Sequence, residues 1–503
     1  MDAAARKRTW IDLFEDLERE HPDVTALSLS GDGGETLSWR DLVRRSAGVS
    51  RLFADRGVKQ GDVVCIQLPN SIAFVLSVIA AWRLGATVAP LRWDLPAPER
   101  AQLVALASPA VSVTQSGSGE GEVSQADVAA ALPVDPATLP PSLPAVPAWM
   151  TASGGSTGSP KLIAPDVSTA VGEGGMPMAG GASRFSDNTD HRHPVHMVCT
   201  PLYHMHGFSL LWRTLTEDFR VVVMPHFETE AFLDLIESER VSFIAIVPTM
   251  VVRLVKSPSF RGRDFSSLET VIFGAGATPE WAIREWIEVV GGESLLLGYG
   301  MSESIAASFI TGTEWLEHPG SVGKPFDVET MVADDDGKPL PPGEVGEVFF
   351  RPEGGREQTF RYVGDAKARM LPGGWASVGD LGKLDKDGYL YIMDRRTDMV
   401  KTGGANVFVS EVEAALLAHA DVADVAVVGL SDPEWGRRVH AIVVLQSGAD
   451  ANEAADRLRS HCKDLLAAYK APRSFEFVDT LGRTDAGKLN RQALARAREE
   501  ENA

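Results

Sequence analysis

Cysteine is scarce in this chain. Only Cys65, Cys199 and Cys462 occur among 503 residues, and no two of them form a Cys-x-x-Cys pair. A zinc-binding cysteine cluster and a disulfide framework both need closely spaced cysteines, so neither kind of site is expected. The composition suits a reducing compartment, and we expect a cytoplasmic protein.

Positive charge is also in short supply. The chain has 48 Lys and Arg against 69 Asp and Glu, which gives a formal net charge of −21. A diffuse negative field repels nucleic acids and anionic membranes, so we expect neither as a partner. Bound phosphates remain compatible with this charge, because backbone N–H groups and a metal ion can hold them locally.

Long apolar runs are missing as well. No apolar stretch follows the charged first residues, so no signal peptide is predicted. The most apolar segment, Ser71–Leu91, is interrupted by Arg83 and Gly85. These interruptions argue against a membrane span, and the segment predicts a buried helix that leads into a strand.

Apolar runs rich in β-branched residues recur through the middle of the chain. Strands are predicted at Val195–Thr200, Arg220–Pro225, Val241–Val247, Leu268–Phe273 and Ser294–Leu297. Helical stretches such as Thr229–Glu239 and Glu280–Val290 lie between several of them. Strands that alternate with helices are typical of parallel α/β layers whose faces are both covered.

The length of 503 residues predicts more than one folding unit. Short strands bounded by Gly and Asp predict a β-rich subdomain over about residues 345–394. Beyond Arg395 a mixed pattern of helices and strands predicts a further unit of ordinary domain size. We therefore predict an α/β protein with a large N-terminal domain of layered sheets and helices over residues 1–394. A small α+β C-terminal domain follows over residues 395–503.

Two helices of this small domain are predicted in detail. Ser410 and Glu413 have the spacing of a capping box, which predicts a helix that begins there. The second helix is predicted at Glu453–Tyr469, where the periodicity makes Cys462 a core residue rather than a nucleophile. Its predicted apolar face consists of Ala454, Leu458, Cys462, Leu465 and Tyr469.

The sharpest local feature is the run Ser153-Gly-Gly-Ser-Thr-Gly-Ser-Pro-Lys161, whose flexible backbone can wrap around a polyphosphate. It is not a Walker A loop, because Gly158 is followed by Ser-Pro-Lys. The same run satisfies Gly-x-Ser-x-Gly with Ser156 as a nucleophile, so a serine hydrolase is a second hypothesis. A nucleophile elbow needs a helix directly after the serine, whereas Leu162–Pro165 reads as extended, which makes this hypothesis the weaker one.

Together with further motifs in a fixed order, the loop resembles the phosphate-binding signature of the adenylate-forming superfamily. That superfamily includes acyl- and aryl-CoA synthetases, peptide-synthetase adenylation domains and luciferases. The other motifs are Pro201–Gly207, Phe273–Pro279, Gly298–Glu303, Ser377–Gly382, Asp385–Phe408 and Leu481–Arg491. The resemblance implies an AMP-forming acid ligase that uses ATP and Mg²⁺ to make an acyl-adenylate, and then transfers the acyl group to coenzyme A.

The resemblance also assigns residues to the nucleotide. Glu303 and Thr157 are expected at the Mg²⁺–ATP complex, since Mg²⁺ takes hard oxygen ligands. Asp380 is expected to accept hydrogen bonds from the ribose hydroxyls, and Arg395 to contact the ribose. The rest of the expected ATP site is Ser153, Gly154, Gly155, Ser156, Gly158, Lys161, Gly274, Ala275, Gly276, Gly298, Tyr299, Gly300, Met301 and Ser302.

Other matched positions concern catalysis and movement. Lys488 matches the adenylation lysine, and His204 the wall between the acyl and thiol channels. Thr397 stands at the hinge position of a mobile small domain, where Asp or Lys is more usual, and Asp394 stands where Gly is usual. The loop expected to enter the site for the thiol step is Gly403, Gly404 and Ala405.

The substrate is encoded more weakly. An apolar acyl pocket suited to an aromatic, alicyclic or medium-length acid is predicted from His204, Trp212, Val247, Thr249, Met250 and Ala306. Coenzyme A is the expected acceptor. A free-standing carrier-protein thiol, an amine, and nitrite activation for the diazotisation of an arylamine stay open as alternatives, and so does the oligomeric state.

Overall fold

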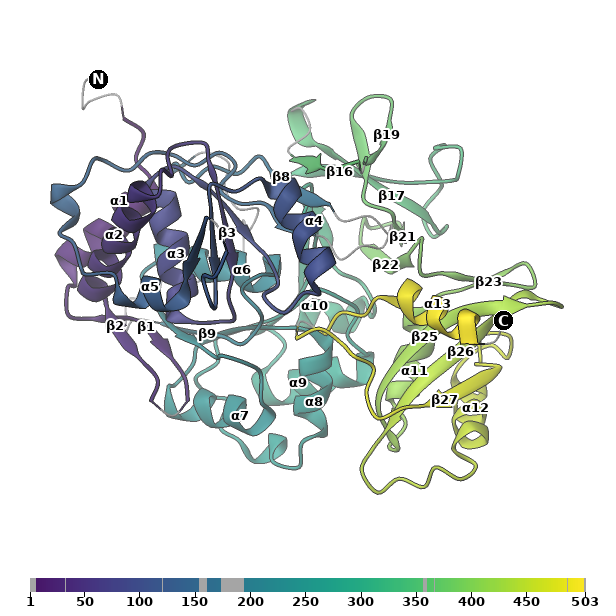
Figure 1. The fold of residues 1–503 in the computed structure, drawn as a ribbon. Coiled ribbons are helices and arrows are strands. Elements are labelled where there is room, and N and C mark those ends of the chain that lie inside the picture. Colours follow the sequence, from purple (N-terminus) through teal and green to yellow (C-terminus); the bar gives the residue numbers. More distant parts are fainter. Residues whose placement is uncertain are drawn as a thin grey trace.

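The computed structural model describes residues 6–31, 33–119, 121–152, 161–172, 194–355, 360–365, 367–485 and 487–501. Most of the predicted phosphate loop, from Ser153 to Pro160 and with it Ser156 and Thr157, lies outside these residues. Figure 1 shows a large body, purple through green, and a yellow-green small unit beside it, in agreement with the predicted α/β protein of one large and one small domain.

The largest sheet of the body has nine strands, of which six run parallel. Its order from edge to edge is β15 (Lys324–Phe326), β14 (Ala307–Thr311), β13 (Leu295–Gly300), β12 (Thr270–Phe273), β11 (Phe243–Ile246), β9 (Val195–Val198), β10 (Arg220–Val223), β1 (Thr25–Leu29) and β2 (Thr36–Ser38). Helices α6 (Met205–Thr216), α7 (Thr229–Ser238), α8 (Pro248–Lys256) and α9 (Glu280–Val290) alternate with its strands along the chain. The predicted parallel α/β layers are confirmed.

A smaller parallel sheet precedes it in the chain, in the order β4 (Thr87–Pro90), β3 (Val63–Gln67), β5 (Val111–Thr114) and β6 (Glu122–Ser124). Helix α3 (Ile72–Arg83) packs with this sheet, and all 12 of its residues are buried. The predicted buried helix before a strand is therefore confirmed. Among the described residues no helix is both long and apolar enough to cross a membrane.

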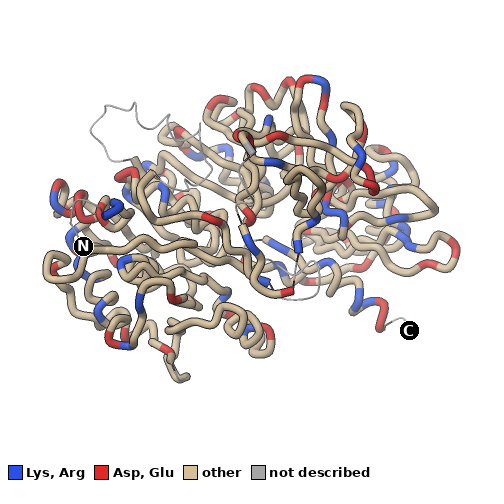
Figure 2. The backbone as a smooth tube through the Cα atoms, turned by 90° about the horizontal axis from the view of Figure 1, so that it is seen from above, with Lys and Arg blue, Asp and Glu red and all other residues tan. Residues whose placement is uncertain are grey.

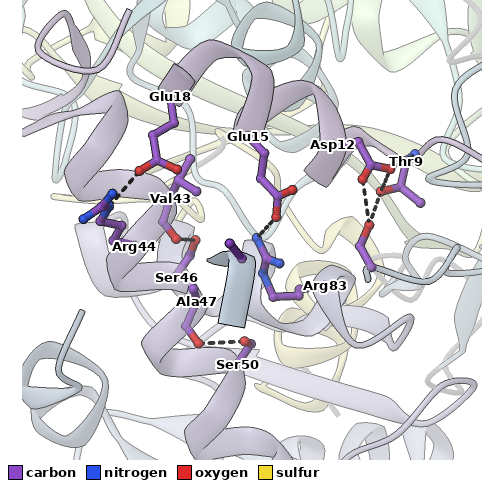
Figure 3. Close-up of polar contacts among 12 residues, drawn as sticks. Thr9, Asp12, Glu15, Glu18, Val43, Arg44, Ser46, Ala47, Ser50 and Arg83 are labelled. Carbon is purple, nitrogen blue, oxygen red and sulfur yellow. Dashed lines mark hydrogen bonds and ion pairs between the residues drawn. The ribbon is translucent and has the colours of Figure 1, made fainter. Parts of the chain in front are cut away.

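Ion pairs tie the first helix to this buried layer (Figure 3). From α1 (Trp10–Glu20), Glu18 accepts a hydrogen bond of 2.7 Å from Arg44 of α2 (Trp39–Asp55). Glu15 accepts one of 2.6 Å from Arg83, which is only 4% exposed. Arg83 can end a fully buried helix because this carboxylate reaches its guanidinium from the neighbouring element.

The β-rich subdomain is an antiparallel sheet of six strands. Its order is β19 (Arg369–Leu371), β20 (Trp375–Ser377), β17 (Gly346–Pro352), β21 (Asp380–Leu384) and β22 (Leu390–Arg395), and β16 (Val328–Ala333) also pairs with β17. The sheet thus begins before the predicted residue 345, because β16 supplies a strand from the preceding segment.

The small domain, by which we mean the elements from β23 (Val400–Thr402) onward, has a hydrophobic core of its own. A three-stranded sheet is formed by β25 (Val422–Asp432), β26 (Gly436–Leu445) and β27 (Ser474–Phe477). Its helices are α11 (Val409–Leu417), α12 (Ala454–Leu465) and α13 (Arg491–Glu501), and the hairpin partner of β23 is β24 (Ala405–Val407).

The structure corrects both detailed helix predictions in this domain. Helix α11 begins at Val409, so Ser410 is no N-cap, and its hydroxyl donates instead to the carbonyl of Met393 at 2.7 Å. Glu413 does not close a capping box, because it accepts from the backbone N–H of Val427 at 2.8 Å. A tertiary hydrogen bond has replaced the local one.

The second helix is shorter than predicted. It ends at Leu465, since Leu466 has an extended backbone, and the side chains of Leu465 and Tyr469 are 56% and 48% exposed. Cys462 is fully buried, as predicted. The hydrophobic core covers only the first three turns of this helix. The apolar spacing in the sequence continues beyond them, to residues that the core does not cover.

Charge is spread over the molecule. Figure 2 shows basic and acidic residues interspersed along the described part of the chain, in the large and in the small domain alike.

Candidate active site

A cluster of polar side chains forms where β13 ends and β21 begins. The hydroxyl of Tyr299 donates to Oδ2 of Asp380 at 2.7 Å, and Nε of Arg395 lies 3.6 Å from Oδ1 of the same carboxylate. Asp380 is buried, whereas the Arg395 side chain is 57% exposed. Burial, followed by the charge of Asp380, raises the pKa of Tyr299, so Tyr299 stays a neutral hydrogen-bond donor. The arrangement leaves Asp380 able to accept hydrogen bonds from hydroxyl groups of a ligand.

A second carboxylate, that of Glu303, lies close to this cluster and is only 7% exposed. The hydroxyl of Tyr362 donates to its Oε1 at 2.7 Å, and no other hydrogen bond to this carboxylate occurs among the described residues. The next residue, Ser304, has a φ of +54°, a backbone conformation that non-glycine residues rarely adopt. Strain of this kind is typical of functional sites.

Tyr362 joins the Glu303 carboxylate to a cation. It lies in β18 (Phe360–Val363), which pairs with β8 (Leu162–Pro165), and the ammonium of Lys161 lies 4.0 Å from the centroid of its ring. Burial lowers the pKa of Lys161, and Glu303 acts in the opposite direction. Tyr362 belongs to none of the motifs in the sequence. Only the pairing of β18 with β8 brings it here.

The residues present fit a magnesium ion of the kind that phosphates help to hold. Mg²⁺ in nucleotide sites takes one or two carboxylates plus phosphate oxygens and water, and Glu303 is a buried carboxylate with a single hydrogen-bond donor. No group of three or more His, Cys, Asp and Glu side chains suited to a metal occurs among the described residues. A metal site here therefore depends on ligands besides acidic side chains, and Thr157 lies outside the described residues.

Lys488 of the small domain reaches the same site. The positive charge of Arg395 and the negative charge of Glu303 both act on its ammonium, although burial by surrounding protein atoms is the largest influence. Their combined effect lowers the pKa of Lys488, while its side chain still keeps access to solvent. In Figure 1 the yellow segment before α13 extends from the small domain to the large one.

The loop that carries Lys488 is shaped by its own hydrogen bonds. The N–H of Lys488 donates to Oγ1 of Thr484 at 3.1 Å, and the N–H of Thr484 donates to the carbonyl of Lys488 at 3.0 Å. Gly487 has a φ of +72°, and a Cβ atom there would lie 2.3 Å from Oγ1 of Thr249 in α8. The loop therefore rests directly on the first turn of α8, at a distance that only glycine permits.

Two half-buried imidazoles, those of His204 and His206, lie beside Lys488. Burial, followed by the charge of Lys488, lowers the pKa of His204 to about 3 and that of His206 to about 4, so both rings are neutral at pH 7. Their Nε2 atoms are buried without a hydrogen-bond partner among the described residues. Unpartnered polar atoms of this kind usually mark a place where a ligand or water completes the site.

The loop after β12 is packed against these imidazoles. A Cβ atom on Gly274 would lie 2.8 Å from Cε1 of His206, and Ala275 has a φ of +64°. A Cβ atom on Gly276 would contact Pro248 at 3.4 Å, and one on Gly298 would lie 2.6 Å from the ring of Phe309. Glycine at 274 and 298 thus serves close packing around the site.

The expected acyl-pocket residues are divided between the site and the core. Thr249 faces the Lys488 loop, and Ala306 donates its N–H to Sδ of Met301 at 3.4 Å. Val247 and Met250 are buried in the hydrophobic cluster of the large sheet. Trp212 is fully buried in the core, with its ring centroid 4.7 Å from that of Trp82.

The expected thiol loop is elsewhere in this arrangement. Gly403 and Gly404 form the turn between β23 and β24, with φ of +55° and +84°, and Ala405 begins β24. The N–H of Gly403 donates to the carbonyl of Trp435 at 2.9 Å, and a Cβ atom there would lie 2.4 Å from the indole. The loop is thus covered by Trp435 of the small domain while Lys488 is in the site.

Thr397, at the expected hinge, is exposed and has an anchored residue on each side. Arg396 donates to Glu347 of the β-rich subdomain at 2.8 Å. Asp398 accepts from Arg491 of the small domain at 3.3 Å. Thr397 is therefore the single residue between a contact to the large domain and a contact to the small one.

Comparison with known proteins identifies the same two parts. The family described as AMP-binding enzyme matches residues 14–355, and the family described as AMP-binding enzyme C-terminal domain matches residues 411–488. A 2-succinylbenzoate–CoA ligase of Geobacillus kaustophilus is 32% identical over 489 residues, which cover 94% of this chain and 95% of the relative. A feruloyl-CoA synthase of an Amycolatopsis species is 31% identical over 499 residues, with 94% and 95% coverage.

Solved structures agree with these sequence relatives. The o-succinylbenzoate CoA synthetase of Bacillus subtilis, in complex with its acyl-adenylate intermediate, superimposes with a TM-score of 0.78 at 26% identity. The match covers 97% of this chain and 98% of that one. The same synthetase in complex with ATP and a magnesium ion matches with a TM-score of 0.76 at 26% identity, over 96% and 98% of the two chains.

Proposed function

We propose that the acid is aromatic and that Lys488 carries the adenylation step, because this chain belongs to the AMP-binding enzyme family and is an ATP-dependent acid–CoA ligase. The enzyme uses ATP and Mg²⁺ to form an acyl-adenylate and pyrophosphate, and it then transfers the acyl group to coenzyme A with release of AMP. This family assignment replaces the serine-hydrolase hypothesis on Ser156.

The observation that carries the proposal is that Lys488 of the small domain shares one site with Glu303 of the large domain and with Arg395 at the domain boundary. When the acid carboxylate attacks the α-phosphate, two anions must meet, so the enzyme has to position them and offset their charge. The Lys488 ammonium bridges the carboxylate and the α-phosphate in this proposal. The neighbouring imidazoles of His204 and His206 are neutral and leave that task to the lysine.

The other polar groups hold the nucleotide. Asp380 accepts hydrogen bonds from the ribose hydroxyls, and Arg395 lies on the other side of the same carboxylate. Glu303, oriented by Tyr362, would hold Mg²⁺ together with Thr157, and the ion when bound neutralises charge on the phosphate oxygens. Gly274, Ala275 and Gly276 after β12 line the nucleotide, and Gly274 lets the backbone approach His206 closely.

The thiol step requires a different arrangement of the domains. We place the boundary between residues 394 and 395 and let the small domain rotate about Thr397, so that Lys488 withdraws and the Gly403–Ala405 loop leaves Trp435 to admit the thiol. Hinge rotations of this type use one or a few exposed residues between anchored segments, which is the position of Thr397.

The aromatic nature of the acid is supported by the relatives and by the pocket wall. The two named relatives act on 2-succinylbenzoate and ferulate, both of which carry a benzene ring. The predicted wall offers small side chains beside the site, those of Ala306, which is buried, and Thr249, which faces the Lys488 loop. A flat ring fits such a wall better than a charged or strongly polar acid.

The test is pyrophosphate release with ATP and Mg²⁺ over a panel of acids that includes benzoate, ferulate, 2-succinylbenzoate, cyclohexanecarboxylate and octanoate. Each acid is assayed with and without coenzyme A. We expect release with aromatic acids, acyl-CoA and AMP when coenzyme A is added, and loss of release in Lys488→Ala. A preference for octanoate or cyclohexanecarboxylate would overturn the aromatic class, and full activity of Lys488→Ala would overturn the role of the lysine.

A further inference from the structure

Helix α8 of the large domain contacts the small domain at both of its ends. At its start, Thr249 lies against Gly487, next to Lys488. At its end, the ammonium of Lys256 donates to the carbonyl of Leu417 at 3.0 Å and to that of Val422 at 2.6 Å. One rigid helix therefore connects the position of the Lys488 loop with a hydrogen-bonded contact on the far side of the same interface.

The Lys256 contact matches the chemistry of its acceptors. Leu417 is the last residue of α11, so its carbonyl lacks an acceptor role within the helix and carries part of the negative end of the helix dipole. Val422 begins β25. Burial lowers the pKa of Lys256 and Asp424 opposes this effect, which is the balance of a partly desolvated cation held at an interface. A lysine in this place serves as a cap on a helix of the other domain.

The interface beside Lys256 is not closely packed. A cavity of about 430 Å³ lies between the two domains. From the large domain it is lined by Arg253, Lys256 and Ser257, and from the small domain by Asp424, Gln446 and Thr480. A cavity removes dispersion contacts, so the orientation of the domains depends more on directed bonds such as those of Lys256.

We propose that Lys256 is a positioning residue for adenylation, because its two hydrogen bonds hold the small domain in the orientation in which Lys488 reaches the reacting acid. The inference rests on the role proposed above for Lys488. Lys256 belongs to the large domain and both carbonyls belong to the small one. A rotation of the small domain that moves these carbonyls by a few ångströms therefore breaks both hydrogen bonds. The contact therefore favours the first half-reaction and must be given up before the second.

The experiment measures the two half-reactions separately. Formation of the acyl-adenylate is followed in a single turnover with ATP, Mg²⁺ and ferulate or 2-succinylbenzoate, whichever gives the greater pyrophosphate release. Consumption of the preformed adenylate is then followed after coenzyme A is added. In Lys256→Met, which keeps the apolar stem, adenylate formation should be about tenfold slower, since each lost bond is to a charged donor. The coenzyme A step should be unchanged or faster.

Two further variants make the result specific. Lys256→Arg should recover most of the rate, because a guanidinium can still donate to both carbonyls. Arg253→Met, on the same helix and lining the same cavity, should change neither half-reaction, because Arg253 makes no hydrogen bond to the small domain among the described residues. Equal slowing of both steps in Lys256→Met, or no slowing of adenylation, would overturn the proposal.

Lys488→Ala in the same assay distinguishes a failure of the positioning role of Lys256 from a failure of the proposed function. If Lys488→Ala abolishes adenylate formation while Lys256→Met does not slow it, the positioning role fails and the proposed function stands. If Lys488→Ala leaves adenylate formation intact, the proposed function fails and the positioning role fails with it.

Discussion

The hydroxyl of Tyr362 donates a hydrogen bond of 2.7 Å to Oε1 of Glu303, across 59 positions of sequence. The same ring lies under the ammonium of Lys161, the last residue of the predicted phosphate loop. Tyr362 thus connects the carboxylate proposed for the metal with the exit of the loop proposed for the phosphates. Neither partner can shift without disturbing the other.

This relationship predicts the effect of Tyr362→Phe. The ring and its contact with Lys161 remain, but Glu303 loses its donor, so its carboxylate is less well oriented for the Mg²⁺–ATP complex. We expect the KM for ATP at saturating Mg²⁺ to rise about fivefold, in line with about 1 kcal/mol for one hydrogen bond. Initial-rate kinetics measure this change. The control is Tyr391→Phe, whose hydroxyl donates to Asp385 at 3.3 Å, and an equal rise there would refute the assignment.

The contact of Gly487 with Thr249 predicts a defect confined to adenylation. Gly487→Ala adds a Cβ atom 2.3 Å from Oγ1 of Thr249 and places alanine at a φ of +72°, so the Lys488 loop must move. Adenylate formation should fall at least tenfold, roughly the effect of 1.4 kcal/mol, while consumption of preformed adenylate by coenzyme A is unaffected. Gly448→Ala is the matched control, with a φ of +84° and open space around the new atom. Similar losses in both variants would attribute the effect to backbone strain alone.

Asp394 predicts a pH dependence of stability. Burial is the largest influence on its carboxyl group and raises the pKa from 3.8 to about 6, despite hydrogen bonds from the N–H groups of Arg395 and Ser410. Since the folded pKa lies above the unfolded one, the stability that this group contributes is fully present below pH 3.8 and is lost as the pH rises through about 6.

Asp394→Asn should therefore raise the free energy of unfolding at pH 7.5, by on the order of 1–2 kcal/mol. The difference from the wild type should shrink as the pH falls below 6 and should disappear near pH 4. Thermal unfolding of both proteins across this pH range measures it. An advantage of the variant that stays constant with pH would mean that its cause is not the ionisation of Asp394.

The buried ion pair between Arg83 and Glu15 predicts a stability defect without a catalytic one. Arg83→Met leaves the Glu15 carboxylate, 30% exposed, without its partner, so the protein should lose about 2 kcal/mol of unfolding free energy. Chemical denaturation measures the loss, and adenylation by the folded variant should be unchanged. Arg40→Met removes an exposed pair with Asp23 and should change stability by less than about 0.5 kcal/mol. Equal losses in the two variants would contradict the role of burial.

Much of the fold and of the site follows from local sequence. The mostly apolar segment Ser71–Leu91 predicted a buried helix, and Ile72–Arg83 forms one. The alternation of strands and helices predicted parallel layers, which β9 to β13 confirm. These predictions succeed because burial of an apolar face is decided by the residues of that segment alone.

Predictions that depended on the partner of a side chain were less secure. Ser410 and Glu413 had the spacing of a capping box, yet both bond to distant residues, because a tertiary acceptor and donor were better placed than the local ones. Trp212 was expected to line the acyl pocket, but its ring packs in the core, with its centroid 4.7 Å from that of Trp82. Periodicity gives the direction of a side chain and not what fills the space in front of it.

The sequence by itself determined the family, the order of the motifs and the identity of the groups that carry charge into the site, since these depend on residue type and spacing. Only the tertiary structure decided which loop is in the site at a given moment. Lys488 is there, while Gly403 is covered by Trp435. That choice depends on contacts between domains, such as the bonds of Lys256 to Leu417 and Val422, and such contacts join residues whose proximity no local pattern encodes.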